Sequence, residues 1–231
     1  MTPAELNKSL TLLLHERLAD TGFSKKKIGT LRRKADACEQ FLTFYLTRER
    51  GLPGNRYSLT ATLGFSFPEV DRLTCEFLGK GDDRKWGTGA QPLYTVVPGR
   101  PVLKYKHCSD EPLGRLADMV SVDFHAYALP FYKKYDTLEK LAEAFEREHL
   151  TGECGFRVVI SGQKPGSGHA CCIAAVLCLL EKWDRLEQFL KETEFLTDAC
   201  KERIDRYFPE RQRRALRGTA EAEQLPARAF P

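Results

Sequence analysis

The stretch Arg56-Tyr-Ser-Leu-Thr-Ala-Thr-Leu-Gly-Phe65 alternates apolar and polar side chains, and this alternation decides the fold. A period of two is typical of a β-strand that has one face on a core and the other in water. The segment from Phe41 to Arg48 is similarly rich in aromatic and β-branched residues. The turn-forming stretch Gly51-Leu-Pro-Gly-Asn55 lies between them, so the sequence predicts a β-hairpin.

A helix is predicted before this hairpin. Thr2-Pro-Ala-Glu5 has a capping-box pattern with proline at the first helical position. Leucines then recur at helical spacing and should pack on the sheet, and Gly22 is suited to the left-handed residue that stops a helix. These leucines are Leu6, Leu10, Leu13, Leu14 and Leu18.

Further elements are expected after the hairpin. Three segments are predicted as additional strands, namely Val70–Leu78, Leu93–Val97 and Val102–Tyr105, with a loop from Gly79 to Pro92. Helices are predicted from Ser109 to Pro130 and from Asp136 onward. The sequence therefore predicts an α+β fold, in which an antiparallel β-sheet meander of four to six strands is flanked by helices, with a small C-terminal helical hairpin or bundle.

The clearest linker-like segment is Ser161-Gly-Gln-Lys-Pro-Gly-Ser-Gly168. It places an α+β domain over residues 1–160, a helical appendage over 169–217 and a flexible tail over 218–231. Its glycines invite comparison with a phosphate-binding loop, but Lys164 precedes the last glycines where the phosphate-loop signature needs a lysine after them. A linker is the favoured interpretation.

Two parts of the chain resemble a known family. Gly22-Phe-Ser-Lys-Lys-Lys, then Leu31-Arg32, and then Ser58-Leu-Thr-Ala-Thr-Leu-Gly-Phe65 resemble the bacterial family called domain of unknown function 4304. Tyr127-Ala-Leu-Pro-Phe-Tyr132 and Leu138-Glu-Lys-Leu141 are similar to its later helix, so the resemblance covers roughly residues 5–148. It implies an α+β fold and a bacterial source, and it brings no established reaction, cofactor or catalytic residue.

The composition is that of an ordinary soluble globular protein. Of the 231 residues, 42% are hydrophobic and 29% charged. The longest apolar run, Ala170 to Leu180, has eleven residues, whereas a membrane-spanning helix needs about 20. The eight cysteines show no Cys-x-x-Cys pair and no secretory signal precedes them, so we expect reduced thiols, a cytoplasmic location and no membrane partner.

Reaction motifs do not emerge from the chain. The nucleophile elbow Gly-x-Ser-x-Gly, the zinc helix His-Glu-x-x-His and the dinucleotide fingerprint are all missing from the sequence. His169, Cys171 and Cys172 lie close together, but small cysteines in an alanine- and leucine-rich helix are more often core residues than ligands or nucleophiles. The sequence thus predicts no catalytic residue, no cofactor and no metal site, and it favours a non-enzymatic protein.

One constellation is suited to binding. Between Arg17 and Lys34 the sequence has seven basic residues against one acid, Asp20. The candidate anion- or partner-binding residues are Lys25, Lys26, Lys27, Arg32 and Arg33. A solvated face, or lysines that keep a sheet edge from pairing with other chains, is the favoured explanation of these residues.

The favoured hypothesis for function is a binding or protein-interaction module, with an inhibitor or immunity-type protein as one form. The alternative is a nucleic-acid-binding protein that uses the Lys25–Lys34 basic ridge, with Tyr45 or Phe44 as base-stacking residues. A weaker alternative is an enzyme that acts on a small anionic ligand between sheet and helices. Another protein is the expected partner, nucleic acid is not favoured, and the oligomeric state stays open.

Overall fold

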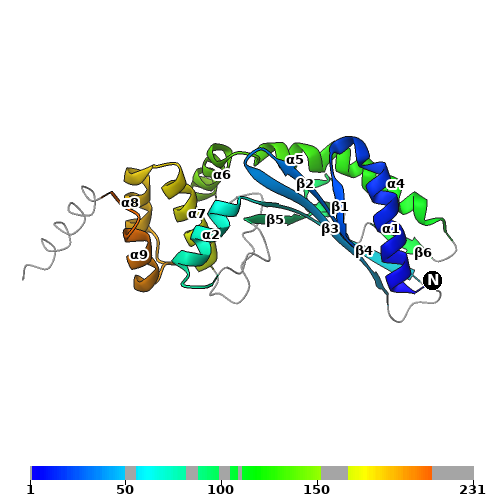
Figure 1. The fold of residues 1–231 in the computed structure, drawn as a ribbon, viewed down its shortest axis with the longest axis horizontal. Coiled ribbons are helices and arrows are strands. Elements are labelled where there is room, and N and C mark those ends of the chain that lie inside the picture. The colour runs from blue at the N-terminus through cyan, green and yellow to red at the C-terminus, as the bar shows by residue number, and fades with distance from the viewer. Residues whose placement is uncertain are drawn as a thin grey trace, which may run out of the picture.

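The computed structural model describes residues 2–49, 56–81, 88–98, 105–108, 111–151 and 166–209, with the side chains of 148–151 excepted. Six strands within these ranges form one antiparallel sheet (Figure 1). They are β1 (Ser24–Lys27), β2 (Thr30–Ala35), β3 (Cys38–Arg48), β4 (Arg56–Ser66), β5 (Gly89–Pro92) and β6 (Lys106–Cys108). The order is β1-β2-β3-β4-β5, and β6 pairs with another part of β4. The α+β fold predicted from the sequence is confirmed.

The predicted hairpin strands β3 and β4 form the centre of the sheet. Each has eleven residues, and their register sets Leu42 opposite Leu63 and Tyr45 opposite Thr60. Alternate residues of both strands are buried on one face, while the others are exposed or half-buried on the opposite face, with Gly64 as the exception. The alternation in the sequence thus separates a covered face from an open one. Its predicted loop, Gly51–Asn55, lies outside the described residues.

Helices α1 (Pro3–Arg17) and α4 (Leu113–Asp123) lie side by side over the covered face. The capping box of α1 forms as predicted, and its leucine stripe is buried except for Leu13, which is half-buried. The Asn7 side chain fastens α1 to β3, because its Oδ1 accepts a hydrogen bond from the Leu46 amide at 2.8 Å. Thr11 Oγ1 likewise accepts from the Gly29 amide at 2.9 Å. Gly22 has φ +77°, as expected for the residue that ends this helical segment.

The predicted end of a helix at Pro130 is wrong. The chain continues from α4 through a π-helical turn, η2 (Phe124–Ala128), into α5 (Leu129–Lys134). An uninterrupted α-helix tolerates proline poorly, because the ring collides with the preceding turn and the missing N–H leaves a carbonyl unpaired. Here the wider π turn comes immediately before the proline, and the helical direction is kept.

Two predicted strands are also wrong. Val70–Leu78 forms helix α2 (Pro68–Phe77), in which Pro68 stands in the first turn and Val70, Leu73 and Phe77 are buried at helical spacing. Leu93–Val97 contains the one-turn helix α3 (Leu93–Val96). In the other direction, the last four residues of the predicted loop Gly79–Pro92 form strand β5. Of the predicted strand Val102–Tyr105, only Tyr105 is described, and it leads into β6.

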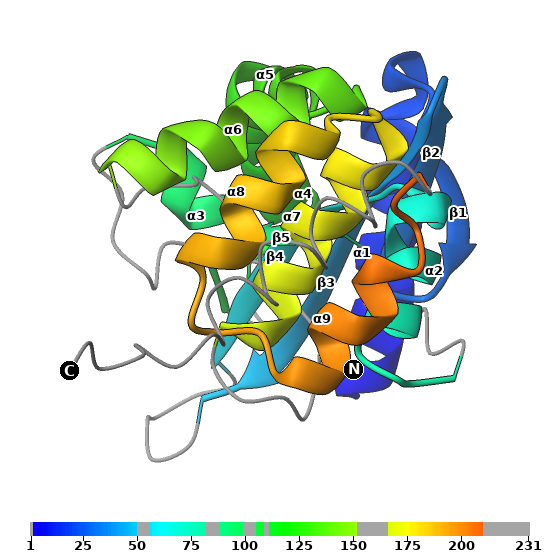
Figure 2. The same ribbon diagram turned by 90° about the vertical axis from the view of Figure 1, so that its left-hand side faces the viewer.

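The remaining helices assemble at one end of the molecule, where α2 joins them (Figure 1). They are α6 (Leu138–Thr151), α7 (Ser167–Leu179), α8 (Trp183–Glu192) and α9 (Asp198–Asp205), and with α2 they are called the helical lobe. The sheet with α1, α3, α4, η2 and α5 is called the sheet lobe. Figure 2 looks onto the end that the helical lobe forms. The C-terminal helical part predicted from the sequence is therefore confirmed.

The helical lobe draws on both parts of the predicted domain division. Helix α7 contacts α2 and α6, which come from the predicted 1–160 domain, as well as α8. One cluster of buried side chains runs through both lobes. Residues 161–165 of the predicted linker, and the tail 218–231, lie outside the described ranges. No helix within those ranges combines the length and the apolar character that a membrane crossing requires.

Candidate partner-binding surfaces

The five basic residues singled out in the sequence belong to the β1–β2 hairpin, but they have different environments. Lys25, Lys26 and Lys27 are exposed on β1, a four-residue strand at the margin of the sheet. Arg32 and Arg33 follow on β2, where neighbouring residues point to opposite faces. Arg32 pairs with Phe41 on the open face, and Arg33 pairs with Gln40 on the covered face. The structure therefore divides the predicted ridge into three parts.

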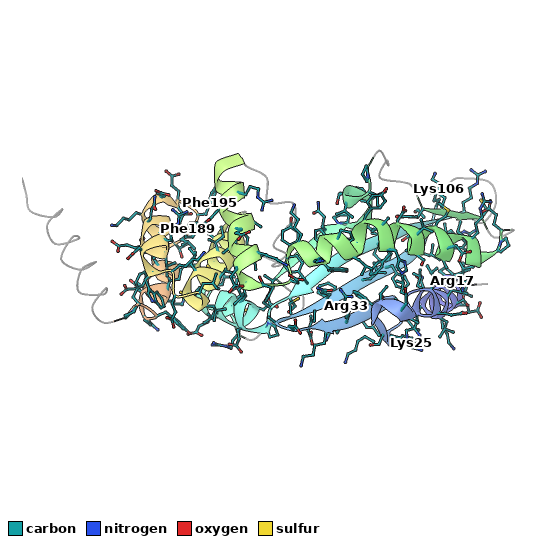
Figure 3. All side chains as sticks on the ribbon, turned by 90° about the horizontal axis from the view of Figure 1, so that it is seen from above. Arg17, Lys25, Arg33, Lys106, Phe189 and Phe195 are labelled. Carbon is teal, nitrogen blue, oxygen red and sulfur yellow. The ribbon has the colours of Figure 1, made fainter. Side chains whose placement is uncertain are left out.

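Arg33 is engaged within the fold. Its Nη1 donates to the Thr21 carbonyl at 2.8 Å, while Nε and Nη2 donate to Gln40 Oε1 at 3.1 and 2.5 Å. Its guanidinium also lies 5.0 Å from the centre of the Phe23 ring, which is a cation–π distance. Figure 3 shows Arg33 over the body of the sheet lobe, whereas Lys25 lies at its margin. Arg33 is thus a structural residue and not an available binding group.

The open sheet face is the largest polar surface that the strands present. It is defined here by residues that pair directly across β2, β3 and β4, namely Arg32, Lys34, Glu39, Phe41, Thr43, Tyr45, Thr47, Ser58, Thr60, Thr62 and Gly64. Tyr45 stands on the central strand β3 with 53% of its surface exposed. Phe44, the other predicted stacking residue, is 1% exposed on the covered face and therefore cannot stack on a base.

A second aromatic ring lies flat on this face. A Cβ added to Gly64 would overlap the ring of Phe41, so the absence of a side chain on β4 gives that ring its place. From the covered side, the Tyr132 hydroxyl donates to the Phe41 carbonyl at 2.6 Å. Burial raises the pKa of Tyr132, which keeps the hydroxyl protonated as a donor. Phe41 is consequently held by β4 on the open face and by α5 on the covered face.

The charge around the open sheet face is predominantly positive. Two acids at this face are paired, since Arg32 contacts Glu39 at 3.0 Å and Lys106 contacts Glu49 at 3.6 Å, and Asp36 is exposed in the turn between β2 and β3. The exposed bases at its margins are Lys25, Lys26, Lys27, Lys34, Arg56 and Lys106. Lys25 and Lys106 lie on opposite sides of the sheet lobe in Figure 3. Three acids, namely Asp36, Glu39 and Glu49, against these bases leave a positive surplus that favours an anionic partner surface.

A groove lies between α6, α7 and α8, with a volume of about 910 Å³. Its walls are mainly apolar and include Phe145, Ala170, Ile173, Leu177, Phe189 and Phe195. Charged side chains line its rim, where Arg185 Nη2 lies 3.4 Å from Glu146 Oε1. The sequence analysis missed this groove, because its walls come from three helices whose mutual packing no local pattern reveals. The one available signal was Phe195 in a polar segment after α8.

Cys171 and Cys172 lie in α7 as core residues, as predicted, whereas His169 is half-buried and lines the groove. Cys171 and Cys172 are 0% and 1% exposed, and the His169 ring packs edge-on against Phe145 at 5.2 Å. Burial raises the pKa of Cys171, which opposes formation of a nucleophilic thiolate. Across the described ranges, no group of three or more His, Cys, Asp or Glu side chains is arranged to hold a metal ion. No disulfide joins the seven cysteines that these ranges include.

Two buried carboxylates hold elements together. Asp71 on α2 accepts hydrogen bonds from the hydroxyls of Ser66 and Thr88, the second at 2.6 Å, and so ties α2 to the ends of β4 and β5. Asp123 on α4 accepts from the Tyr105 hydroxyl at 2.6 Å beside β6. Both contacts connect secondary-structure elements, which is a structural role.

Comparison of the chain with protein-family models, with curated proteins and with solved structures found no match. The resemblance to domain of unknown function 4304 stays a prediction, and the binding surfaces have to be judged on their own chemistry.

Proposed function

We propose that this chain is a non-enzymatic binding protein that docks another protein on its open sheet face. The observation that carries the proposal is the exposed Tyr45 at the centre of a sheet whose opposite face is closed by helices. Interfaces between proteins are enriched in tyrosine, phenylalanine and arginine, and tyrosine is frequent among the residues that contribute most to affinity. Tyr45, Phe41 and Arg32 supply all three types on adjacent strands.

The rigidity of this surface favours docking. Tyr45 stands on an eleven-residue strand that pairs with β4 along most of its length and with β2 up to Thr43, so little backbone freedom is lost when a partner binds. The ring of Phe41 is already fixed over Gly64. Rows of threonine on β3 and β4 add hydroxyl groups that can donate or accept hydrogen bonds. The surface is thus preorganised for a partner of complementary shape.

The partner we propose has an acidic surface. The basic margins of the open sheet face would steer such a partner into place and disfavour basic competitors. An inhibitor or immunity-type protein that covers its target is one form of this function. The resemblance to domain of unknown function 4304 supports a bacterial source, and thiols without disulfides among the described cysteines accord with a cytoplasmic location.

A second candidate is binding of single-stranded nucleic acid. The specific observation in its favour is that exposed lysines on β1 occur in the same sheet as the exposed ring of Tyr45, and basic grooves with aromatic stacking residues are typical of single-strand binding. Against it, Phe44 is buried and Arg33 is engaged within the fold. Protein docking therefore comes first.

The test uses the proteins encoded beside this chain as candidate partners. Each is produced together with the chain, complexes are isolated by size-exclusion chromatography, and affinities are measured by calorimetry. We expect one of them to bind, and Tyr45→Ala to weaken that complex by roughly 30-fold or more, as for a central interface residue. The matched control is Leu12→Ala, which removes another large exposed side chain from α1, on the covered side of the sheet.

Two outcomes would count against protein docking. A complex that binds Tyr45→Ala and Leu12→Ala equally well would place the interface elsewhere. A fluorescent single-stranded oligonucleotide provides the second check. Tight binding whose logarithm falls with log salt at about 0.7 per phosphate contact, and which is lost when Lys25, Lys26 and Lys27 become glutamate, would favour the nucleic-acid candidate.

A further inference from the structure

We propose that the groove between α6, α7 and α8 is a second docking site, which takes an amphipathic helix bearing basic residues from a partner protein. This proposal goes beyond docking on the open sheet face and does not depend on it. Phe189 and Phe195 lie in the helical lobe, far along the molecule from Arg17 and Lys106 of the sheet lobe (Figure 3). The groove is therefore a separate surface.

The walls of the groove match the apolar face of a helix. Three helices enclose about 910 Å³, and the side chains that line the floor include Ile173, Leu177 and Phe189. An amphipathic helix presents apolar side chains at positions i, i+3, i+4 and i+7, and such a row fills a groove between helices. The space is partly open to solvent, which suits an element that continues beyond the groove.

Phe195 is placed as an anchor at the rim. It is 63% exposed, the second most exposed large hydrophobic side chain among the described residues. Its ring lies against the backbone of Gly166, where an added Cβ would come within 2.6 Å of Phe195 Cδ1. Gly166 also has φ +95°, a conformation that disfavours any other residue. A glycine at the start of α7 thus lets an aromatic ring sit at the groove without being buried.

The charge of the rim determines the chemistry of the occupant. The lining includes Glu146, Glu192 and Glu194 against Arg185, and Arg185 is already paired with Glu146. Glu192 is the last residue of α8, where the helix dipole adds partial negative charge. One end of the groove is therefore acidic beside Phe195, and complementarity calls for lysine or arginine next to the apolar row of the bound helix.

The experiment uses the intact chain and a synthetic probe. The probe is a fluorescein-labelled helical peptide of about 14 residues made only of leucine and lysine, with leucines at i, i+3, i+4 and i+7. Its partner peptide has glutamate in place of every lysine. Fluorescence anisotropy measures affinity at about 0.15 M salt. We expect saturable binding of the lysine peptide, at least about tenfold weaker binding of the glutamate peptide, and slower amide exchange in α8 when the lysine peptide is bound.

Matched variants locate the site. Phe195→Ala should weaken binding by about tenfold or more, whereas Ile28→Ala, which removes a side chain of 57% exposure from the β1–β2 hairpin, should change it less than about twofold. Glu194→Lys should weaken binding more than Glu202→Lys on α9, which makes the same change of charge outside the groove. Circular dichroism checks that each variant is folded.

Three results would overturn the proposal. The first is no saturable binding of the lysine peptide to the intact chain, which would show that the groove does not admit a helix. The second is equal loss of binding in Phe195→Ala and Ile28→Ala. The third is binding that follows net charge alone, with Glu202→Lys as damaging as Glu194→Lys in the rim.

Discussion

The sheet lobe and the helical lobe bury their cores in different ways. In the sheet lobe, β1 to β4 pair in the order of the chain, and each strand divides its side chains between a covered and an open face. In the helical lobe, α7 is buried on almost every side by its chain neighbours α6 and α8 and by α2, which comes from a distant part of the chain. The comparison teaches that a lobe with alternating strands leaves a polar surface, whereas a lobe built around one apolar helix leaves an apolar groove.

Helix α2 connects the sheet lobe with the helical lobe. It follows β4 directly, yet it packs on α7 and α9. Phe77 at its end is fully buried, its ring meets the Tyr207 ring edge-on at 5.3 Å, and its carbonyl accepts a hydrogen bond from Arg203 Nη1 at 3.1 Å. Changes at Phe77 therefore test whether the lobes are independent.

The largest effect is expected from Phe77→Ala. Removal of a buried phenylalanine ring should lower the free energy of unfolding by about 3 to 5 kcal/mol, because apolar contacts are lost and a cavity is left. Urea unfolding followed by circular dichroism measures the change. Because one buried cluster runs through both lobes, we expect a single transition at lower urea. Phe77→Leu is the control and should cost about 1.5 kcal/mol or less.

Amide hydrogen exchange would show directly whether the two lobes unfold together or separately. In Phe77→Ala, equal loss of protection in β3 and in α7 would mean one cooperative unit. Loss confined to α2, α7 and α9, with a second urea transition, would show that the lobes unfold separately and would contradict the expectation.

An intermediate loss of stability is expected from Arg33→Ala. This change removes hydrogen bonds from a charged group to Thr21 and Gln40 and a contact with the Phe23 ring. We expect the free energy of unfolding to fall by about 1.5 to 3 kcal/mol. Lys26→Ala, on the exposed strand β1, should change it by about 0.5 kcal/mol or less. Equal effects of the two substitutions in thermal unfolding would erase the distinction between structural and surface bases.

The smallest effect on stability is expected from Gly64→Ala. The added methyl group should displace the Phe41 ring from the open sheet face, at a cost of about 1 kcal/mol because that ring is half-exposed and can move. Nuclear magnetic resonance of isotope-labelled Phe41 reports the displacement. Gly114→Ala in α4 is the control, since an added Cβ there has no neighbour within 4 Å, and alanine should stabilise the helix by about 0.5 to 1 kcal/mol. An unmoved Phe41 ring would disprove the proposed packing.

The two central strands of the sheet could be predicted from the sequence because alternation is a local property. Strands β3 and β4 can be recognised from alternating apolar residues, such as Leu59 and Leu63, even when the elements that cover them are unknown. The helical structure of α2 could not be predicted in the same way. Leu73, Cys75 and Phe77 alternate like a strand, while Val70, Leu73 and Phe77 also follow helical spacing, and a segment of ten residues is too short to separate the two periods.

The candidate surfaces were only partly within reach of the sequence. Lys25, Lys26 and Lys27 are exposed because their strand lies at the edge of the sheet. Arg32 and Arg33 lie on opposite faces because of the strand register, and a shift of one residue would exchange their faces. The flat ring of Phe41 depends on Gly64 being its cross-strand partner. The groove needs the packing of three helices, which is a property of tertiary structure alone.

Helix α2 is synthesised well before α7, the helix that covers it in the folded protein. Its main partner α7 begins about 90 residues after α2 ends, which at roughly 5 to 20 residues per second is a delay of about 5 to 20 seconds. Through that interval the apolar side chains of α2 lack the helix that will cover them, while the strands beside it already have their neighbours. The nascent chain thus has a defined period in which α2 is a target for chaperones, and any message truncated before α7 yields a product that keeps this surface exposed.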